Sequence, residues 1–150
     1  MSNAKVFRMR ILAADFNKEI VDVMIEAASA EGATLGAVTA GTTRVPGCYE
    51  LPFVANLALK RADCDFLVVL GYIERGETLH GEVMGQVVSR LLLELSLKYD
   101  RPIGIGIIGP GATLEQALAR RDGHARAAVR AALACLRVSG ELDTPGPRGQ

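Results

Sequence analysis

The chain has 150 residues, 49% of them hydrophobic and 23% charged, and its 17 lysines and arginines balance its 17 aspartates and glutamates. This length suits one domain, and this composition indicates a folded globular protein rather than a disordered one. Zero net charge disfavours a general nucleic-acid binder or a binder of anionic membranes, and no apolar run approaches the ~20 residues that cross a bilayer.

The first part of the chain reads as strand, helix, strand. Residues 8–14 have the apolar character of a strand, and apolar residues then recur at helical spacing. Asn17 suits the N-cap of that helix, and Gly32 suits its end. Residues 34–39 form the second expected strand.

A second unit leads to the most apolar stretch of the chain. Residues 44–52 form a turn into a helix, with Pro52 in a first-turn position where its missing N–H costs nothing. That helix is expected to run to about residue 61, and the apolar run over residues 66–70 forms the third strand. Residues 71–80 then form a glycine-containing turn that opens another helix.

Residues 80–112 again alternate between a helix and a strand. A broad apolar stripe predicts a helix from His80 to about residue 99, where a proline soon follows. Residues 103–108 form the fourth expected strand, in which Gly104 and Gly106 let a neighbouring element approach closely. Residues 109–112 are expected to be a loop.

The end of the chain is predicted to hold two helices and a tail. Thr113 and Gln116 have capping-box spacing, so a helix should cover residues 114–121 and give way near residues 122–123. A last helix follows it. Residues 140–150, rich in glycine and proline, are expected to be a disordered tail, which leaves residues 1–139 as one domain.

Alternating strands and helices predict an α/β fold, with a mainly parallel four-stranded sheet covered by helices on both faces as a three-layer sandwich. Ligands of such sheets bind outside the carboxyl ends of the strands. The loops at those ends are residues 15–17, 45–52, 72–80 and 109–113.

Cysteine and histidine usage gives no sign of a disulfide framework or a metal site. Cys48, Cys64 and Cys135 lie far apart and form no Cys-x-x-Cys pair, which is typical of reduced thiols in the cytoplasm. Neither histidine has a cysteine or carboxylate at ligand spacing, so no metal is expected. The first ten residues lack the apolar region of an export signal, and we expect a cytoplasmic protein.

The turn after the third strand carries the clearest chemical pattern. Gly76, Glu77 and Thr78 precede a helix, where free amides and the helix dipole favour an anion, although an ordinary capped helix fits the same residues. His80 stands where imidazole would exchange protons at neutral pH, or it is structural. Arg120 is either an anion ligand or a surface residue favoured by the helix dipole.

Two further loops offer weaker signals. Phe16, at the end of the first strand, is suited to stack on a flat ring or to cover the core. Glu50 is suited to bind a polyol or to remain in solvent.

Taken together, these residues resemble the 6,7-dimethyl-8-ribityllumazine synthase family of riboflavin biosynthesis, over roughly residues 8–137. The resemblance rests on Phe16-Asn17, on Val45-Pro46-Gly47-Cys48-Tyr49-Glu50-Leu51-Pro52, on Arg75-Gly76-Glu77-Thr78-x-His80 and on Leu114-Glu115-Gln116-Ala117-x-x-Arg120. It implies a flavodoxin-like sheet and a transferase that condenses 5-amino-6-(D-ribitylamino)uracil with 3,4-dihydroxy-2-butanone 4-phosphate. No cofactor or metal is implied.

The resemblance also implies roles for single residues. Phe16 would stack on the pyrimidine, Asn17 and Glu50 would hold the ribityl chain, and Cys48 and Tyr49 would line the same wall. The amides of Gly76, Glu77 and Thr78 would bind the phosphate with Arg120, and His80 would transfer protons. The same pocket would include Tyr72, Ile73, Glu74 and, from the adjacent subunit, a residue at the position of Ile105.

Departures from the family pattern bear on affinity and assembly. Glu74 occupies a usually aliphatic position near the pyrimidine, and residues 109–112 replace a polar segment. The chain also lacks the insertion after Arg120 seen in shell-forming members, so homopentamers or decamers with shared active sites are expected. The alternatives are a non-catalytic lumazine- or flavin-binding protein on this fold and, with less support, an archaeal-type riboflavin synthase or a flavodoxin-like redox domain.

Overall fold

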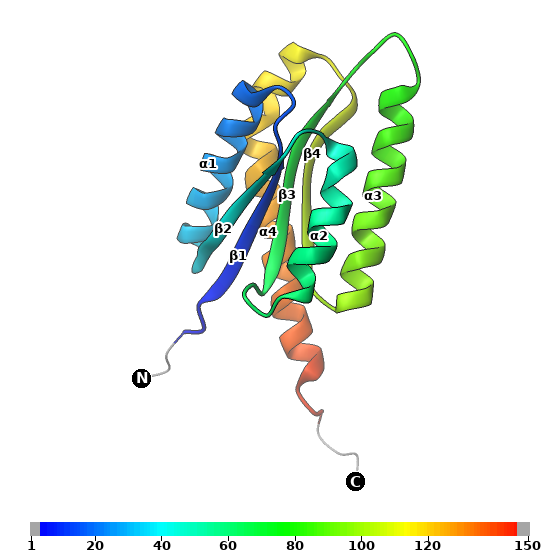
Figure 1. The fold of residues 1–150 in the computed structure, drawn as a ribbon. Helices are drawn as coiled ribbons and strands as arrows, with labels where there is room; N and C mark the ends of the chain where they lie inside the picture. The colour runs from blue at the N-terminus through cyan, green and yellow to red at the C-terminus, as the bar shows by residue number, and fades with distance from the viewer. Residues whose placement is uncertain (1–3, 147–150) are drawn as a thin grey trace.

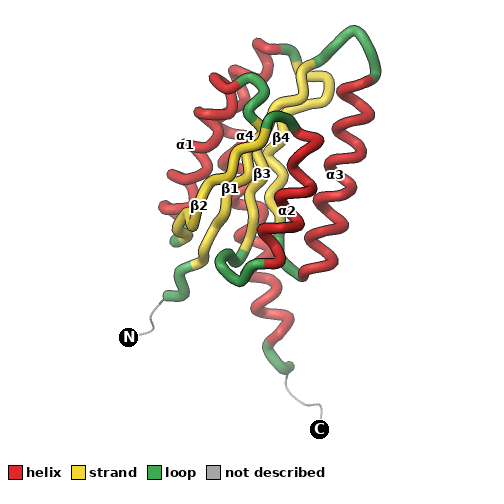
Figure 2. The backbone as a smooth tube through the Cα atoms, in the orientation of Figure 1, coloured by secondary structure: helices red, strands yellow, loops and turns green. Residues whose placement is uncertain are grey.

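The computed structural model describes residues 4–146, which form one four-stranded sheet between two layers of helices (Figure 1, Figure 2). In chain order the elements are β1 (Phe7–Ala14), α1 (Lys18–Thr34), β2 (Ala37–Val45), the 3-10 turn η1 (Cys48–Glu50), α2 (Leu51–Lys60), β3 (Phe66–Glu74), α3 (His80–Tyr99), β4 (Ile103–Ala112) and α4 (Leu114–Asp143). The strands are all parallel, in the order β2-β1-β3-β4. The predicted α/β class and the four-stranded sheet with helices on both faces are confirmed.

The sheet separates two apolar cores because successive side chains of a strand point to opposite faces. On β1, Met9, Ile11 and Ala13 face the core shared with α1 and α4. Leu12 and Ala14 face the core shared with α2 and α3. Figure 1 shows the two helix pairs on opposite sides of the sheet.

Close packing of α4 on β4 confirms the role expected for Gly104. A Cβ at Gly104 would collide with the main-chain carbonyl of Ala128, and one at Gly106 would lie 3.2 Å from the Ala128 side chain. The last helix therefore sits directly on the backbone of β4, where larger side chains would hold it away.

The end of α1 and the position of β2 differ from the sequence prediction. Helix α1 continues past Gly32 to Thr34, and β2 covers Ala37–Val45 instead of residues 34–39. A Cβ at Gly32 would lie 2.9 Å from the Cε atom of Met9, so this glycine allows close packing on β1. The chain turns instead at Gly36, whose φ of 84° favours glycine.

The predicted loop over residues 109–112 is part of β4. Ala112 pairs with Glu74, and the Arg75 N–H donates to the Ala112 carbonyl over 3.0 Å. Strands β3 and β4 thus both extend beyond the apolar runs at 66–70 and 103–108 from which they were predicted, and β3 carries Tyr72, Ile73 and Glu74 on regular structure.

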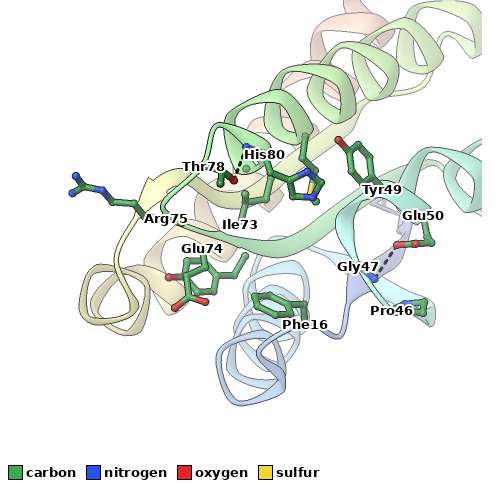
Figure 3. Close-up of a pocket in the computed structure, with 14 residues that line it drawn as sticks. Phe16, Pro46, Gly47, Tyr49, Glu50, Ile73, Glu74, Arg75, Thr78 and His80 are labelled. Atoms are coloured by element: carbon green, nitrogen blue, oxygen red, sulfur yellow. Dashed lines mark hydrogen bonds between the residues drawn. The ribbon is translucent and has the colours of Figure 1, made fainter.

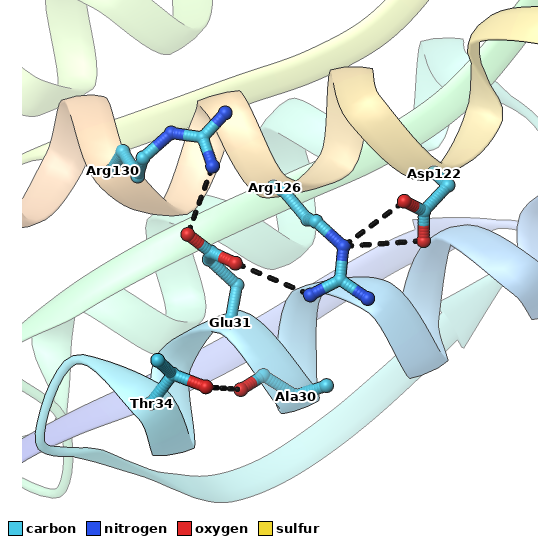
Figure 4. A network of polar contacts seen from close by, with 6 residues as sticks. All are labelled: Ala30, Glu31, Thr34, Asp122, Arg126 and Arg130. Atoms are coloured by element: carbon cyan, nitrogen blue, oxygen red, sulfur yellow. Dashed lines mark hydrogen bonds and ion pairs between the residues drawn. The ribbon is translucent and has the colours of Figure 1, made fainter.

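Helix α4 is continuous, so the predicted break near residues 122–123 is wrong. Asp122 accepts a hydrogen bond from Arg126 one turn later, over 3.0 Å. Glu31 of α1 pairs with Arg126 over 3.2 Å and with Arg130 over 2.9 Å (Figure 4). These contacts fix α4 along α1 and outweigh a single glycine, which costs a helix roughly 1 kcal/mol relative to alanine.

The start of α4 agrees with the sequence prediction, whereas its end lies later in the chain. The capping box at its start is confirmed, since the Gln116 N–H donates to the Thr113 hydroxyl over 3.3 Å and the Thr113 N–H donates back to the Gln116 side chain over 3.0 Å. The helix then passes Gly140 and ends at Asp143, so the first residues of the expected tail are helical. The last part of the expected tail, residues 147–150, lies outside the described residues. Over residues 4–146, no helix is both long and apolar enough to cross a membrane.

Candidate active site

A pocket of about 540 Å³ opens at the carboxyl ends of β1, β2 and β3 (Figure 3). The chain adds β2 on one side of β1 and then β3 on the other, and ligands of open α/β sheets bind at such a reversal. The pocket is lined by Phe16, Pro46, Gly47, Tyr49, Glu50, Tyr72, Ile73, Glu74, Arg75, Gly76, Thr78, His80, Gly81 and Met84.

Phe16 forms the wall that follows β1. Its ring is 51% exposed and lines the pocket, and its N–H donates to the Pro46 carbonyl over 3.0 Å. Asn17 takes the predicted N-cap position of α1 in a left-handed conformation, but its side chain makes no capping hydrogen bond. Asn17 is not among the residues that line the pocket.

The segment after β2 supplies the opposite wall. Tyr49 meets His80 edge-on, with ring centroids 5.8 Å apart and planes at 68°. The Gly47 N–H donates to the Glu50 carboxylate over 3.0 Å, so this carboxylate lies against its own turn at the rim of the pocket. A Cβ at Gly47 would lie 3.1 Å from a Glu50 carboxylate oxygen, so glycine at this position leaves room for the contact.

Cys48 does not line the pocket, in contrast to the sequence-based expectation. It is buried behind the wall, where a Cβ at Gly71 would lie 2.8 Å from its Sγ atom. Burial raises the pKa of the Cys48 thiol to about 12, with a further contribution from the Glu50 carboxylate. At neutral pH this thiol is protonated and inert.

The end of β3 forms the floor. Tyr72 donates its hydroxyl hydrogen to the Ala112 carbonyl over 3.0 Å, which ties β3 to β4 beneath the pocket. Burial raises the pKa of Tyr72, and the nearby Glu74 carboxylate raises it further, so the phenol stays protonated. Ile73 is buried, whereas Glu74 is exposed at the strand end.

The turn between β3 and α3 forms the third side, and residues 74–80 are all exposed. Within the described part of the chain, the main-chain N–H groups of Gly76, Glu77 and Thr78 have no hydrogen-bond partner. The His80 N–H approaches the Thr78 hydroxyl at 3.4 Å, and His80 is the first residue of α3. Gly76, Thr78 and His80 line the pocket, but Glu77 does not.

Arg120 and Ile105 are not brought to this pocket within one chain. Arg120 is exposed on α4 and lines a separate concavity of about 300 Å³ with Gln116 and His124. Ile105 is half-buried against the core beneath α2 and α3. The expected pairing of Arg120 with the turn of Thr78 is therefore absent from the single chain.

Five lining residues were not assigned from the sequence. Pro46, Gly47 and Arg75 lie inside the motifs of residues 45–52 and 75–80, so their position beside assigned residues was the available signal. Gly81 and Met84 follow His80 on α3, and Met84 is one helical turn after it. Helical spacing from His80 was the available signal for Met84.

The pocket is apolar at one end and rich in hydrogen-bond donors at the other. Phe16 offers a ring face, the free amides of Gly76 and Thr78 offer an anion cradle with that of Glu77 in the same turn, and the His80 imidazole lies beside that cradle. No group of three or more metal-ligating side chains occurs among residues 4–146. The arrangement suits a flat, ring-containing molecule and a small anionic one held side by side.

Comparison with known proteins gives a consistent result. The family model described as 6,7-dimethyl-8-ribityllumazine synthase matches residues 6–140. A protein of that name from Staphylothermus marinus is 42% identical over 137 residues, covering 91% of each chain. Namesakes from Metallosphaera sedula and Aeropyrum pernix are each 38% identical, covering 87% and 95% of this chain and 86% and 97% of their own.

Proposed function

The chain belongs to the 6,7-dimethyl-8-ribityllumazine synthase family, transferases of riboflavin biosynthesis, and we propose that its pocket condenses 5-amino-6-(D-ribitylamino)uracil with 3,4-dihydroxy-2-butanone 4-phosphate. Two substrates must meet there, one with a flat ring and a polyol chain, the other with a phosphate. The two ends of the pocket match these two chemistries.

The pyrimidine is assigned to the end formed by Phe16. Its exposed ring stacks on the heterocycle, over the floor made by Tyr72 and Ile73. Glu74, at the rim of that floor, is placed to accept hydrogen bonds from ring N–H groups. The free oxygen of Glu50 accepts hydrogen bonds from the ribityl hydroxyls. Asn17 lies outside the residues that line the pocket.

The phosphate is assigned to the amides of Gly76, Glu77 and Thr78. Unpaired N–H groups before a helix bind anions through hydrogen bonds and through the positive end of the helix dipole. Holding the phosphate there places the ketone of the same molecule toward the pyrimidine. Such positioning removes part of the entropic barrier of a two-substrate reaction.

His80 is assigned the proton transfers. The 5-amino group attacks the ketone, water leaves as a Schiff base forms, phosphate is eliminated, and the ribitylamino nitrogen closes the second ring with loss of another water. Each of these steps moves a proton, and an imidazole beside the phosphate cradle is suited to give and take it near neutral pH. Tyr49 limits the rotation of this imidazole by its edge contact.

The finished site is proposed to lie between subunits of a homopentamer or decamer. Two observations support this assembly. Arg120 is exposed and lines a concavity of its own, so a second copy is needed to bring an arginine to the phosphate. Large apolar side chains are also exposed on the two neighbouring helices α2 and α3, namely Phe53 and Leu57 on α2 and Val83 and Val87 on α3. Sedimentation should give a pentamer or decamer, whereas a megadalton particle would contradict the proposal.

One observation carries the enzymatic proposal: a single pocket contains a stacking ring, a Tyr49–His80 pair and a set of free amides. Mixing the purified protein with both substrates should generate lumazine fluorescence, with inorganic phosphate released. Tight lumazine binding without condensation would indicate a binding protein instead. Absence of both would overturn the proposal.

A further inference from the structure

Arg44, the penultimate residue of β2, connects three segments that surround Phe16. Its Nε atom donates to Asp15 over 2.6 Å, and its terminal nitrogen donates to Asp22 over 2.6 Å. Asp15 directly precedes Phe16, and Asp22 lies on α1, the helix that begins after Asn17. We call Arg44, Asp15 and Asp22 the Arg44 latch.

Main-chain hydrogen bonds join the same two segments as the Arg44 latch, the end of β1 and the end of β2. The Asp15 N–H donates to the Val45 carbonyl over 2.7 Å, and the Phe16 N–H donates to the Pro46 carbonyl over 3.0 Å. Lys18 also holds Asp22 over 2.8 Å, and the contacts with Lys18 and Arg44 lower the pKa of that carboxyl. Asp22 is therefore ionised at neutral pH and available to Arg44.

These contacts leave the Phe16 ring free while fixing the backbone on both sides of it. Phe16 is half exposed, and none of the three latch residues lines the pocket. The geometry points to Arg44 as a positioning residue, which sets the Phe16 ring against the bound heterocycle without touching it. This inference rests on the proposed function, because it assigns Phe16 to the pyrimidine.

Arg126 on α4 offers a matched control. Arg126 also bridges two carboxylates, Asp122 and Glu31, and its side chain is 32% exposed, as is that of Arg44. Arg126 lines none of the described pockets near Phe16. An Arg126→Met variant therefore loses a comparable ion-pair network without disturbing the Phe16 loop.

The test compares Arg44→Met, Arg44→Lys and Arg126→Met in steady-state assays, with each substrate varied in turn. Arg44→Met should raise KM for the pyrimidine about three- to tenfold, the scale of two partly exposed ion pairs, and leave KM for the butanone phosphate near native. Arg44→Lys should recover part of the loss, since an ammonium group cannot bridge both carboxylates as a guanidinium does. Arg126→Met should change neither KM.

Equal rises in both KM values, or the same KM change in Arg126→Met, would show a general stabilising role and overturn the inference. An unchanged pyrimidine KM in Arg44→Met would overturn it as well. Titrating 6,7-dimethyl-8-ribityllumazine into the native protein and the variants distinguishes a failure of this inference from a failure of the proposed function. If the native protein binds the lumazine without turnover, the proposed function fails while the dissociation constants of the variants still test Arg44. If it binds neither substrate nor lumazine, both fail.

Discussion

The ring of Tyr49 stands edge-on to the imidazole of His80, although the two residues come from η1 and from the first turn of α3. Edge-to-face aromatic pairs favour one relative orientation over a freely rotating side chain. The pair therefore restricts where the imidazole points, between the Phe16 side of the pocket and the free amides before α3.

Removing the ring of Tyr49 should slow the reaction through His80. The aromatic pair is worth about 0.5–1.5 kcal/mol, so Tyr49→Ala should lower kcat by up to about tenfold. Tyr49→Phe retains the ring and should keep near-native kcat, which turnover by lumazine fluorescence would measure. A Tyr49→Phe variant as slow as Tyr49→Ala would instead assign the function to the hydroxyl group.

Two inactive variants should restore activity when they assemble together. His80→Gln removes the imidazole that is proposed to transfer protons, and Arg120→Ala removes the arginine that a neighbouring copy is proposed to supply. In an evenly mixed oligomer, about one quarter of the shared sites would hold both native residues, because each residue comes from a different copy.

Co-expression of the two variants with different affinity tags isolates such mixed oligomers. Each variant alone should be nearly inactive, and the mixed oligomer should regain a measurable part of the native rate. Mixed oligomers that stay as inactive as their parents, beside an active native protein, would place Arg120 outside the shared site.

The wall behind the pocket should tolerate no added methyl group at Gly71. A Cβ there would lie 2.8 Å from Cys48 Sγ and 3.4 Å from the Ala14 side chain. Gly71→Ala should destabilise the protein by about 1–3 kcal/mol, the usual cost of overpacking a core. Adding Cys48→Ala removes the closest atom and should restore part of that loss. Urea unfolding of the single and double variants measures the coupling, and strictly additive effects would contradict it.

The ion pairs of Glu31 with Arg126 and Arg130 should make stability depend on pH. Hydrogen bonds from Arg130 and Arg126 hold the pKa of Glu31 below its usual 4.5, although its side chain is only 13% exposed. Because the folded pKa is the lower one, this stabilisation is complete above the unfolded value and is lost as the pH falls through the folded value.

Glu31→Gln should therefore lower Tm at neutral pH, and its Tm should approach that of the native protein as the pH falls below 4.5. Thermal unfolding followed at several pH values measures this convergence. A Tm difference that stays constant down to strongly acidic pH would show that charge on Glu31 is not its cause.

Motifs at the strand ends contain most of the residues that line this pocket. Phe16, Tyr49 and His80 follow three different strands, and a parallel sheet brings those ends to one edge. The sequence could not place Cys48, since whether a residue lines a pocket or backs its wall depends on which side of a short turn packs on Gly71.

Longer-range contacts explain the other differences. Asp122 and Gly123 are local signals for a helix end, but the ion pairs with Glu31, which is distant in sequence, hold α4 continuous. The separation of Arg120 from His80 within one chain could not be predicted either, because the motif that contains Arg120 says nothing about where α4 places this side chain relative to the turn before α3. Contacts between segments distant in sequence, rather than local propensity, decide such cases.

The rate of lumazine formation and the phosphate released with it, in the native protein and in His80→Gln, test the central claim most directly. Glu82→Gln, in the same turn of α3 but outside the pocket lining, provides the control. The native protein and the control should release one phosphate for each lumazine formed, and His80→Gln should be slower by about 10²–10⁴. A native rate in His80→Gln, or no lumazine from the native protein, would contradict the assignment of this pocket.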